Sequence, residues 1–540
     1  MTSLVGLGQP AITDSDEAYY AEAAREMVAS GDWLTPHFNF RDRWEKPVLY
    51  YWLTATTYLV TGPTEFAARA WSALAGIVLA FLAWSTARHA GATSLGAWLA
   101  GAITATSFGH LSMTRAALPD LPLAACITAS IWASLRAVDA THPRWWWLVA
   151  GLSAGLGFLM KGPIALVVAA VVLLPIWWRE RTTVRLPIAD LALAALVAIA
   201  VALPWYGAMT ATHGWPYLES FFVADNFERF ATTRFNEPRP VWFYLPVVLG
   251  GLMPWTPYLL ALPTAYAFER GTSAMRSLGR GQWRWEWRLG LWAVMPLVFF
   301  SASVGQQPRY VIPVLPPLAV LLAMGIANRV EARASGTPSR HGLATGTWVV
   351  AFVLVSCAAL LVRLRSLFEP APIVLWSAVA ATGACAVGLA WIAATRRWRA
   401  LPIALTLSAT VLLMSIQRVA LTGPRPAAVE RMAVLVRAHR IADEPVASYR
   451  VLVRNLVFYT TLPQVELFDD AQARAFLASP DRVLLIVRPD DLARVVDGLG
   501  RVPRTLAQID YVNTADIRLR TILAPDPALI RETVLLVSNR

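Results

Sequence analysis

Long apolar segments alternate with short polar loops over most of this 540-residue chain. A helix needs about 20 apolar residues to cross the hydrocarbon of a bilayer, and about twelve windows approach that length. These windows are Phe66–Ala87, Leu95–Met113, Leu118–Val138, Trp146–Met160, Pro163–Trp178, Leu186–Met209, Val241–Leu262, Leu289–Val304, Tyr310–Ile326, Thr347–Val362, Pro372–Ala394 and Leu401–Ser415. The pattern predicts a mainly α, polytopic membrane protein with about twelve transmembrane helices.

A polar stretch, residues 14–47, comes before the first apolar window. Asp14 or Ser15 is a suitable N-cap, and apolar residues then recur at helical spacing. We expect an amphipathic helix that lies on the bilayer without crossing it. It would belong to an extracytoplasmic segment formed by residues 1–63.

The pattern changes again near residue 422, where charged and apolar residues mix. Helix-like patterns alternate there with strand-like runs, which predicts a small α/β domain outside the membrane. The helix-like patterns are Ala427–His439 and Asp490–Leu499, and the strand-like runs are Val446–Leu452, Leu456–Thr461, Val483–Val487 and Thr533–Val537. We therefore expect a transmembrane body at residues 64–421 and an extracytoplasmic accessory domain at residues 422–540.

Composition supports the membrane assignment. The chain is 56% hydrophobic and 15% charged, with a net charge of +12. Arginines concentrate in alternate loops, at roughly seventeen against eight, and such an excess marks the cytoplasmic side. The net charge is therefore mostly a matter of topology. The acidic N-terminal stretch, the loop at residues 210–240 and the C-terminal domain are expected outside the cytoplasm, and no basic stripe suggests binding to nucleic acid.

Cysteine and histidine give no sign of a metal centre. Cys126, Cys357 and Cys385 all lie in apolar windows, so disulfides and Cys-based metal sites are not expected. The seven histidines lack close metal-ligand pairing. We predict no metal-binding residues, and a divalent metal stays open as a cofactor.

Lysine is rare in this chain. Of 47 basic residues, only Lys46 and Lys161 are lysines, and each lies beside Pro or Gly at a predicted membrane boundary. An ammonium is a compact point charge suited to a phosphate oxygen, whereas the guanidinium of arginine is a planar fork. We interpret both lysines as phosphate contacts. The alternative is a chance placement in which the side chains extend to the membrane interface.

Carboxylates occur on the same predicted side of the membrane. Asp16 and Glu17 open the amphipathic helix, and Asp120 lies in a short loop between apolar windows. A carboxylate in such a position can accept a proton from an attacking group. Asp120 is alternatively a simple cap for the helix that follows it.

Two further segments on this side carry candidate anion contacts. The loop at residues 210–240 resembles an amphipathic interfacial helix, in which Arg229 stands between Phe227 and Phe230. Arg309 and Tyr310 begin another membrane segment, where they are either interface anchors or ligand contacts.

Several motifs in one order carry a family resemblance. They are DSDEAYYAEAAREMVASGDWLTPHFN, EKPVLYYWL, TRAALPDLPL, GLGFLMKGPIAL, PWYGAM, FFVADNFERF and PRYVIPVLPPLA. Together they resemble the bacterial membrane glycosyltransferases of the ArnT-like and protein O-mannosyltransferase superfamily, over roughly the first 330 residues. The resemblance implies a GT-C fold and an inverting glycosyltransferase. Such an enzyme moves a sugar from a polyprenyl-phosphate donor to a lipid A-like glycolipid or another cell-envelope acceptor, on the outer side of the cytoplasmic membrane.

The resemblance also implies residue roles. Asp16, with Glu17 and Asp120, becomes the catalytic carboxylate set, and Lys46 becomes the lysine that holds the carrier phosphate. Lys161, Arg229, Arg309 and Tyr310, chosen above from their position and chemistry and not from the resemblance, complete the expected phosphate contacts. Three departures from the family stand out: the family's first membrane helix is expected to be missing, Tyr19 replaces a common arginine, and Asn226 replaces a common histidine.

Alternatives to a glycolipid-modifying enzyme remain. One is a protein O-mannosyltransferase-like enzyme, whose acceptor is a polypeptide. A second is a transporter or flippase for a lipid-linked sugar. Such a protein needs an apolar groove for the lipid and cations for its phosphate, but no catalytic base. A third is an inactive homologue that only binds lipid.

Overall fold

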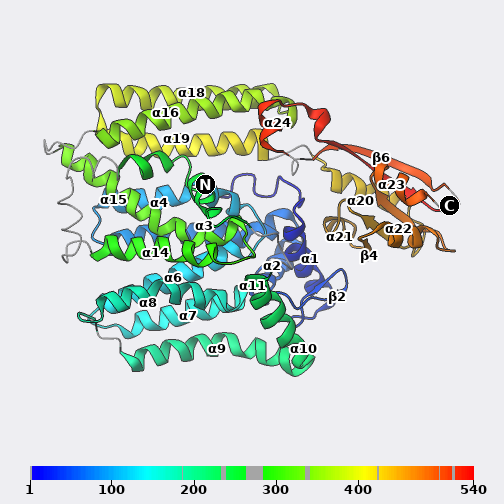
Figure 1. Ribbon diagram of the computed structural model, residues 1–540, viewed down its shortest axis with the longest axis horizontal. Coiled ribbons are helices and arrows are strands. Elements are labelled where there is room, and N and C mark those ends of the chain that lie inside the picture. Colours follow the sequence, from blue (N-terminus) through cyan, green and yellow to red (C-terminus); the bar gives the residue numbers. More distant parts are fainter. Residues whose placement is uncertain are drawn as a thin grey trace.

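The structure is a computed structural model that describes residues 3–184, 187–232, 239–262, 284–334, 341–421, 425–497, 499–500, 502–513 and 517–540. A large body of roughly parallel helices makes up most of the molecule, and a smaller α/β domain lies at one end of it (Figure 1). The first two helices, α1 and α2, lie where the two parts meet.

Each of the twelve predicted apolar windows coincides with helical structure. The helices of the body are α2 Leu49–Thr61, α3 Glu65–His89, α4 Ser94–Ala105, α5 Phe108–Thr114, α6 Asp120–Asp139, α7 Arg144–Lys161, α8 Ile164–Glu180, α9 Ile188–His213, α12 Tyr244–Gly251, α14 Arg284–Ser301, η3 Pro308–Val314, α15 Leu315–Ala334, α16 His341–Arg363, α17 Arg365–Phe368, α18 Pro372–Thr395, η4 Trp398–Ala400, α19 Leu401–Ile416 and η5 Gln417–Leu421. The expected polytopic α fold is confirmed.

Within the described residues, seven helices are long and apolar enough to cross a membrane by length and composition. The pair Tyr244–Gly251 and Thr256–Leu262 makes an eighth span if it is counted as one, although it bends by 107°. The window at Leu95–Met113 is also broken, into α4 and α5. The remaining predicted spans are shorter or less apolar helices packed among the long ones.

Small residues let neighbouring helices of the body approach closely. A Cβ added at Gly151 on α7 would lie 2.3 Å from the carbonyl oxygen of Ala194 on α9, and one added at Gly155 would lie 2.9 Å from that of Ala198. Both pairs are spaced four residues apart, as in the small-xxx-small motif of membrane helices. Backbone packing of this kind takes the place of a hydrophobic driving force, which is absent within lipid.

Helix α1 (Ser15–Ser30) begins where the sequence predicts. The Asp14 side chain accepts hydrogen bonds from the backbone N–H groups of Asp16 and Glu17, and Gly31 closes the helix at φ 74°. The helix does not lie on a surface with one free polar face, however. Its residues are buried on several sides because α2 and the C-terminal domain pack against it. The expected position of α1 at the bilayer surface, without crossing the bilayer, stays a prediction. The strands β1 (His37–Phe38) and β2 (Arg41–Asp42) follow it.

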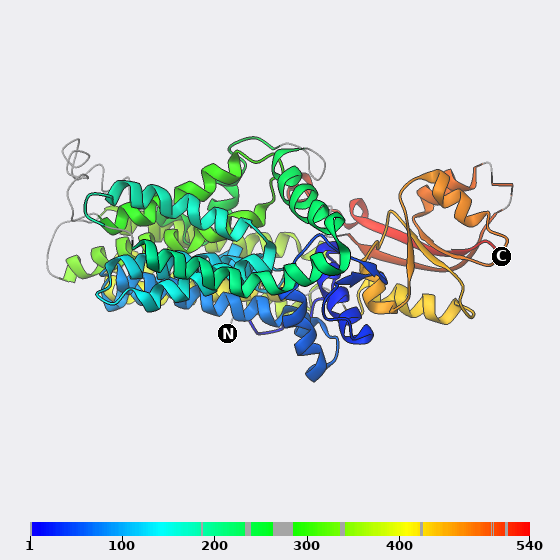
Figure 2. The same cartoon turned by 90° about the horizontal axis from the view of Figure 1, so that it is seen from below.

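The loop at residues 210–240 is helical over most of its described part, as its amphipathic pattern predicts. It forms α10 (Trp215–Leu218), a π-helix η1 (Glu219–Glu228) and α11 (Arg229–Ala231). In Figure 2 this segment stands against the end of the helical body that faces the C-terminal domain.

The C-terminal domain is built on a five-stranded sheet of order β4-β3-β5-β7-β6. Strands β3, β4 and β5 pair in parallel, whereas β7 pairs antiparallel with both β5 and β6. The elements are α20 Ala428–His439, β3 Val446–Tyr449, α21 Asn455–Thr460, β4 Gln464–Leu467, α22 Asp470–Leu477, β5 Leu484–Val487, α23 Pro489–Val496, β6 Arg504–Val512, α24 Leu519–Leu523, η7 Pro527–Leu529 and β7 Arg531–Ser538. The predicted α/β character is confirmed. The run Leu456–Thr461, expected as a strand, belongs to helix α21 instead.

Candidate functional site

A cavity of about 630 Å³ opens at the end of the helical body that faces the C-terminal domain. Its lining combines aromatic and apolar residues with an unusual density of charge. The charged side chains that line it are Asp16, Arg43, Glu45, Lys46, Asp120, Lys161, Asp225, Arg309 and Arg454. These residues come from both halves of the sequence, so only the folded chain brings them together.

Arg309 bridges the two aspartates that the sequence analysis selected. Its Nη2 donates to Oδ2 of Asp16 at 2.5 Å, and its Nε lies 3.6 Å from Oδ2 of Asp120. Arg309 belongs to the 3₁₀ turn η3, immediately before helix α15. Asp16 and Asp120 are therefore placed on opposite sides of one guanidinium.

Asp120 is the first residue of α6 but does not cap it. Its Oδ1 accepts a hydrogen bond from Nζ of Lys161 at 2.5 Å, and its side chain is 5% exposed. The N-cap of α6 is Pro119, without a side-chain cap hydrogen bond. The capping interpretation of Asp120 was wrong. The residue instead holds Lys161, whose ammonium lies 5.0 Å from the centroid of the Tyr310 ring.

Asp16 is the most accessible of the three aspartates that line the cavity, with a side chain that is 41% exposed against 5% for Asp120 and 4% for Asp225. Burial raises the pKa of Asp16, but the positive charge and the hydrogen bond of Arg309 more than offset it, so the pKa lies below its ordinary value of 3.8. Asp16 is thus an ionised carboxylate at neutral pH. One of its oxygens is engaged by Arg309, and the side chain borders the cavity.

Lys46 approaches the same cavity from the segment that precedes α2. Its Nζ donates to the carbonyl oxygen of Glu45 at 2.7 Å and lies 3.6 Å from Oδ1 of Asp225 on η1. The π-helix of the 210–240 loop therefore contributes an acid to the site through Asp225. Tyr310 also lines the cavity, next to Arg309.

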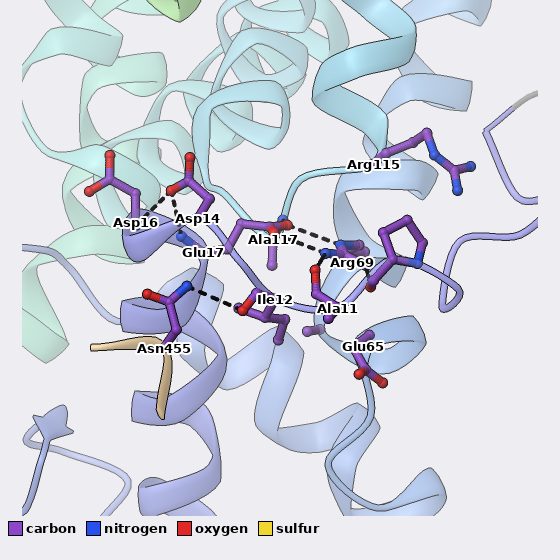
Figure 3. Close-up of polar contacts among 12 residues, drawn as sticks. Ala11, Ile12, Asp14, Asp16, Glu17, Glu65, Arg69, Arg115, Ala117 and Asn455 are labelled. Carbon is purple, nitrogen blue, oxygen red and sulfur yellow. Dashed lines mark hydrogen bonds and ion pairs between the residues drawn. The ribbon is translucent and has the colours of Figure 1, made fainter. Parts of the chain in front are cut away.

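Glu17 takes no part in the cavity, contrary to its expected catalytic role. Its two carboxylate oxygens accept hydrogen bonds from Arg69 at 3.0 and 2.9 Å, and Oε1 also accepts one from the backbone N–H of Ala117 at 2.7 Å. Figure 3 shows Glu17 pointing toward Arg69 while Asp16 points away from it. Successive helix positions diverge by about 100°, so adjacent acids serve different surroundings. Glu17 fastens α1 to α3, and we withdraw it from the catalytic set. The Arg229 side chain lies outside the described residues.

A second cavity, of about 500 Å³, adjoins the first at Arg309, which lines both. Its other lining residues are mostly apolar and come from α5, α12, η3, α16 and α19, among them Phe108, Val248, Leu412 and Ile416. The charged cavity and the apolar one therefore share Arg309 as a lining residue.

Four charged lining residues escaped the sequence analysis as candidates: Arg43, Glu45, Asp225 and Arg454. Arg43 stands within the polar stretch at residues 14–47 but belongs to no motif singled out for chemistry. Arg454 belongs to the C-terminal domain, which was expected to be only a cap. No local signal marks either arginine, because their proximity to Asp16 is a product of tertiary folding.

Among the described residues, no group of three or more His, Cys, Asp and Glu side chains is arranged to hold a metal ion. Five basic side chains line the charged cavity, namely Arg43, Lys46, Lys161, Arg309 and Arg454. Guanidinium and ammonium groups at this density favour an anionic ligand.

Comparison with known proteins gives a consistent result. A family model described as dolichyl-phosphate-mannose-protein mannosyltransferase matches residues 11–218. The undecaprenyl phosphate-alpha-4-amino-4-deoxy-L-arabinose arabinosyl transferase of Pseudomonas aeruginosa (strain UCBPP-PA14) is 32% identical over 405 residues, which cover 74% of this chain and 70% of that protein.

Two further relatives bear the same name. Transferase 2 of Proteus mirabilis is 31% identical over 328 residues, which are 60% of this chain and 57% of that protein. The transferase of Edwardsiella ictaluri is 35% identical over 311 residues, which are 57% of this chain and 54% of that protein. In these two cases the match spans little more than half the length of the relative.

Solved structures agree on the fold. The crystal structure of ArnT from Cupriavidus metallidurans bound to undecaprenyl phosphate superposes with a TM-score of 0.74 at 21% identity, covering 100% of this chain and 96% of that one. The oligosaccharyltransferase of Archaeoglobus fulgidus gives a TM-score of 0.55 at 13% identity, over 94% of this chain and 68% of that one. The helical body and the appended domain are thus a known arrangement.

Proposed function

Since the chain belongs to the family of the undecaprenyl phosphate-alpha-4-amino-4-deoxy-L-arabinose arabinosyl transferases, we propose that it is a membrane glycosyltransferase. Its donor is a sugar linked to a polyprenyl phosphate, and its acceptor is a glycolipid similar to lipid A. The observation that carries this proposal is that a charged cavity and an apolar cavity have Arg309 as a common lining residue.

The two cavities match the two parts of the donor. A polyprenyl chain is apolar and fits the cavity lined by α5, α16 and α19. The phosphate then lies at Arg309, where Lys161 and Lys46 are also within the charged cavity. Because a guanidinium presents five N–H donors, Arg309 can bond Asp16 and a phosphate oxygen at once.

The reaction is a single displacement. An acceptor oxygen attacks the anomeric carbon of the sugar, and the bond between that carbon and the phosphate oxygen breaks. The electron pair leaves with the polyprenyl phosphate, and the proton of the acceptor passes to the carboxylate of Asp16. One displacement inverts the configuration at the anomeric carbon.

The cations stabilise the leaving group. Negative charge grows on the phosphate oxygen as the bond breaks, and fixed positive charge in a site shielded from water lowers the energy of that state. Arg309 and Lys161 are held in place by Asp16 and Asp120, so they need little reorganisation when the charge develops. Asp120 is accordingly a positioning residue.

The proposed location is the cytoplasmic membrane, with the site and the C-terminal domain on its outer side. The excess of arginine in the alternate loops supports this orientation. Arg144, Arg181 and Arg288 lie at the ends of helices away from the cavity, as the positive-inside rule requires for a site on the outer side.

A polypeptide is the second candidate acceptor. The family model that matches residues 11–218 is named for mannosyl transfer from dolichyl phosphate to protein. The chemistry at the anomeric carbon would be the same for a hydroxyl of serine or threonine. The two candidates therefore differ only in whether a glycolipid or a polypeptide enters the cavity as acceptor.

The test is to supply the purified full-length protein in lipid nanodiscs with undecaprenyl phosphate bearing a radiolabelled sugar, either 4-amino-4-deoxy-L-arabinose or mannose. We expect label to reach an added phosphorylated disaccharide glycolipid. Label on an unstructured polypeptide acceptor would support the second candidate instead. If all label stayed on the carrier lipid, and the protein reconstituted in sealed vesicles moved that lipid from one leaflet to the other, it would be a transporter, which contradicts both candidates.

A further inference from the structure

The C-terminal domain contributes one side chain to the charged cavity. Arg454 lies between β3 and α21 and lines the cavity together with Asp16 and Lys46. The rest of the charged lining comes from the helical body and the segments around α1. Arg454 is therefore the residue through which the C-terminal domain reaches the charged cavity.

The docking of the domain fixes Arg454 relative to Asp16. The backbone N–H of Ile12 donates to the hydroxyl of Tyr459 at 2.7 Å, and Nδ2 of Asn455 donates to the carbonyl oxygen of Ile12 at 3.2 Å. Figure 3 shows Asn455 bonded to Ile12, two residues before Asp14. Asn39 and Gln464 exchange two more hydrogen bonds, of 2.7 and 2.8 Å. Asn455, the residue that follows Arg454, thus fixes the segment that leads into helix α1.

The backbone holds Arg454 in a conformation that residues with a side chain rarely adopt, with φ 75° and ψ −40°. Such conformations persist only where the surroundings impose them, and they gather at functional sites. The nearest acid is Glu466, whose Oε2 lies 3.9 Å from Nε. Within the described part of the chain, the buried Nε has no hydrogen-bond partner, so the guanidinium retains donor capacity.

Arg454 and Arg43 both lie against the aromatic ring of Tyr19. The Cζ atom of Arg43 is 3.6 Å from the centroid of the Tyr19 ring, and that of Arg454 is 4.6 Å from it. Two guanidinium groups therefore meet at Tyr19, one turn along α1 from Asp16. Lys161 and Arg309 lie on the other side of the charge network, bonded to Asp120 and Asp16. The cavity therefore has two cationic groups, and Asp16 is bonded to Arg309 in one and feels the charge of Arg43 in the other.

Resting on the proposed function, we propose that Arg454 and Arg43 bind an anionic group of the acceptor, a phosphate, and so place the acceptor beside Asp16. The planar fork of arginine matches phosphate oxygens in a bidentate manner. The donor phosphate is already provided for at Arg309 and Lys161, next to the apolar cavity. In the second group, Nε of Arg43 donates to the Tyr51 hydroxyl at 3.2 Å and lies 3.5 Å from Oε2 of Glu45, so a second anion would bind through the Nη groups of Arg43 and through Arg454. Asp16 is bonded to Arg309 and also feels the charge of Arg43, which suits transfer between ligands held by the two groups.

Binding measurements test this inference without relying on turnover. The full-length protein in nanodiscs is titrated with a bis-phosphorylated disaccharide glycolipid, with the same lipid stripped of its phosphates, and with undecaprenyl phosphate. We expect Arg454→Ala to weaken binding of the phosphorylated lipid roughly tenfold to a hundredfold, because a hydrogen bond between charged groups is lost. Binding of the other two ligands should stay at the wild-type level, and Arg454→Lys, which keeps the charge, should lie in between.

Arg450→Ala is the matched control. Arg450 belongs to the same connecting segment, also has a positive φ, and also lies over a tyrosine ring, at 4.9 Å, but it does not line the cavity. It should bind all three ligands as the wild type does. Equal weakening in both variants, unchanged binding of the phosphorylated lipid by Arg454→Ala, or a loss confined to undecaprenyl phosphate would each overturn the inference. Failure of the proposed function would look different: the wild type would bind the lipids but transfer no sugar.

Discussion

Helix α6 carries a charged cluster at each end, and the two clusters use their charges differently. Asp120 opens the helix at the cavity, whereas Asp139 closes it about 30 Å away. At the far end, Arg288 bonds both Asp139 and Glu180, and Arg284 bonds Glu180 as well. Arg288 is 1% exposed, with its nitrogen atoms aimed at these acids. This far cluster is a closed network.

The near cluster is open. Asp16 is 41% exposed, the ion pair between Arg309 and Asp120 is long at 3.6 Å, and a cavity of about 630 Å³ adjoins them. In the far cluster the acids and arginines pair with one another, whereas in the near cluster similar residues retain the capacity to bind a ligand. Charge in a membrane protein is a sign of function when it is accompanied by space for a ligand.

The largest effect should come from Asp16→Asn. An amide cannot accept the proton of the acceptor, so we expect kcat for sugar transfer to fall about 10²- to 10⁴-fold. The measurement is label transfer by purified protein at saturating donor. Asp139→Asn in the far cluster is the control and should leave kcat per folded molecule near the wild-type value. Equal losses in both variants would contradict the distinction between the clusters.

The far cluster should instead respond in stability. Arg288→Met leaves Asp139 and Glu180 with only part of their partners, and breaking a buried charge network costs about 3–5 kcal/mol. We expect a clearly lower thermal unfolding midpoint in detergent, with undecaprenyl phosphate binding unchanged in the molecules that remain folded. Loss of lipid binding at temperatures well below unfolding would show that the far cluster has a functional role.

Lys161→Met tests whether the ammonium of the near cluster binds the donor phosphate. Removal of the ammonium takes a phosphate contact and leaves Asp120 without its closest partner. We expect undecaprenyl phosphate to bind roughly tenfold to a hundredfold more weakly, since a hydrogen bond to a charged group is lost. Adding Asp120→Asn to this variant should recover part of the affinity, because the unpaired negative charge is removed. A double variant that binds more weakly than Lys161→Met would contradict this arrangement.

The pH profile reports on Asp16. The pKa of this group is held below its ordinary value of 3.8 by Arg309, so the proton-accepting form persists as the pH falls. We expect kcat/KM to show no decline from this group between neutral pH and about pH 4, and to decrease only below that. Arg309→Gln removes the lowering charge and should move the acidic limb to higher pH. If the acidic limb of the kcat/KM profile did not move in Arg309→Gln, that limb would belong to a group other than Asp16.

The smallest effect concerns Glu26 on α1, outside both clusters. Burial, the charge of Glu22 and the hydrogen bond with Glu22 raise the pKa of Glu26 to about 8. The folded protein therefore binds a proton there that the unfolded chain releases above its ordinary pKa of 4.5, so stability falls as the pH rises from that value to about 8.

Glu26→Gln removes this penalty while its amide oxygen can still accept the hydrogen bond of the Phe40 N–H. We expect the variant to be more stable than the wild type by about 1 kcal/mol above pH 8, a gain that disappears near pH 4. Thermal unfolding at both pH values measures it. A gain of equal size at both would exclude titration of Glu26 as the cause.

Much of the fold could be predicted because membrane helices have a strong local signature. All twelve apolar windows contain helices, and Asp14, one of the two predicted N-cap candidates, caps α1. The error at Leu456–Thr461 has a physical reason: a short apolar run fits a strand or a buried helix equally well, and periodicity cannot separate them. Packing against α20 and α1 selects the helix.

The site was only partly predictable. Asp16, Lys46, Asp120, Lys161, Arg309 and Tyr310 were chosen from motifs and membrane position, and all of them line one cavity. Glu17 shares the motif of Asp16 but faces another direction, which follows from helix geometry once Arg69 is in place. Arg43 and Arg454 had no local signal, because a guanidinium becomes relevant only through the neighbours that folding supplies.

The contact of Asn455 and Tyr459 with Ile12 has a consequence for biosynthesis. A ribosome makes the segment before α1 first and α21 more than 400 residues later. The helices of the body enter the membrane in between, while helix α1 still lacks the surface that covers it. The charged lining of the cavity is thus completed only when translation is nearly finished, because Arg454 is the last of its residues to be made.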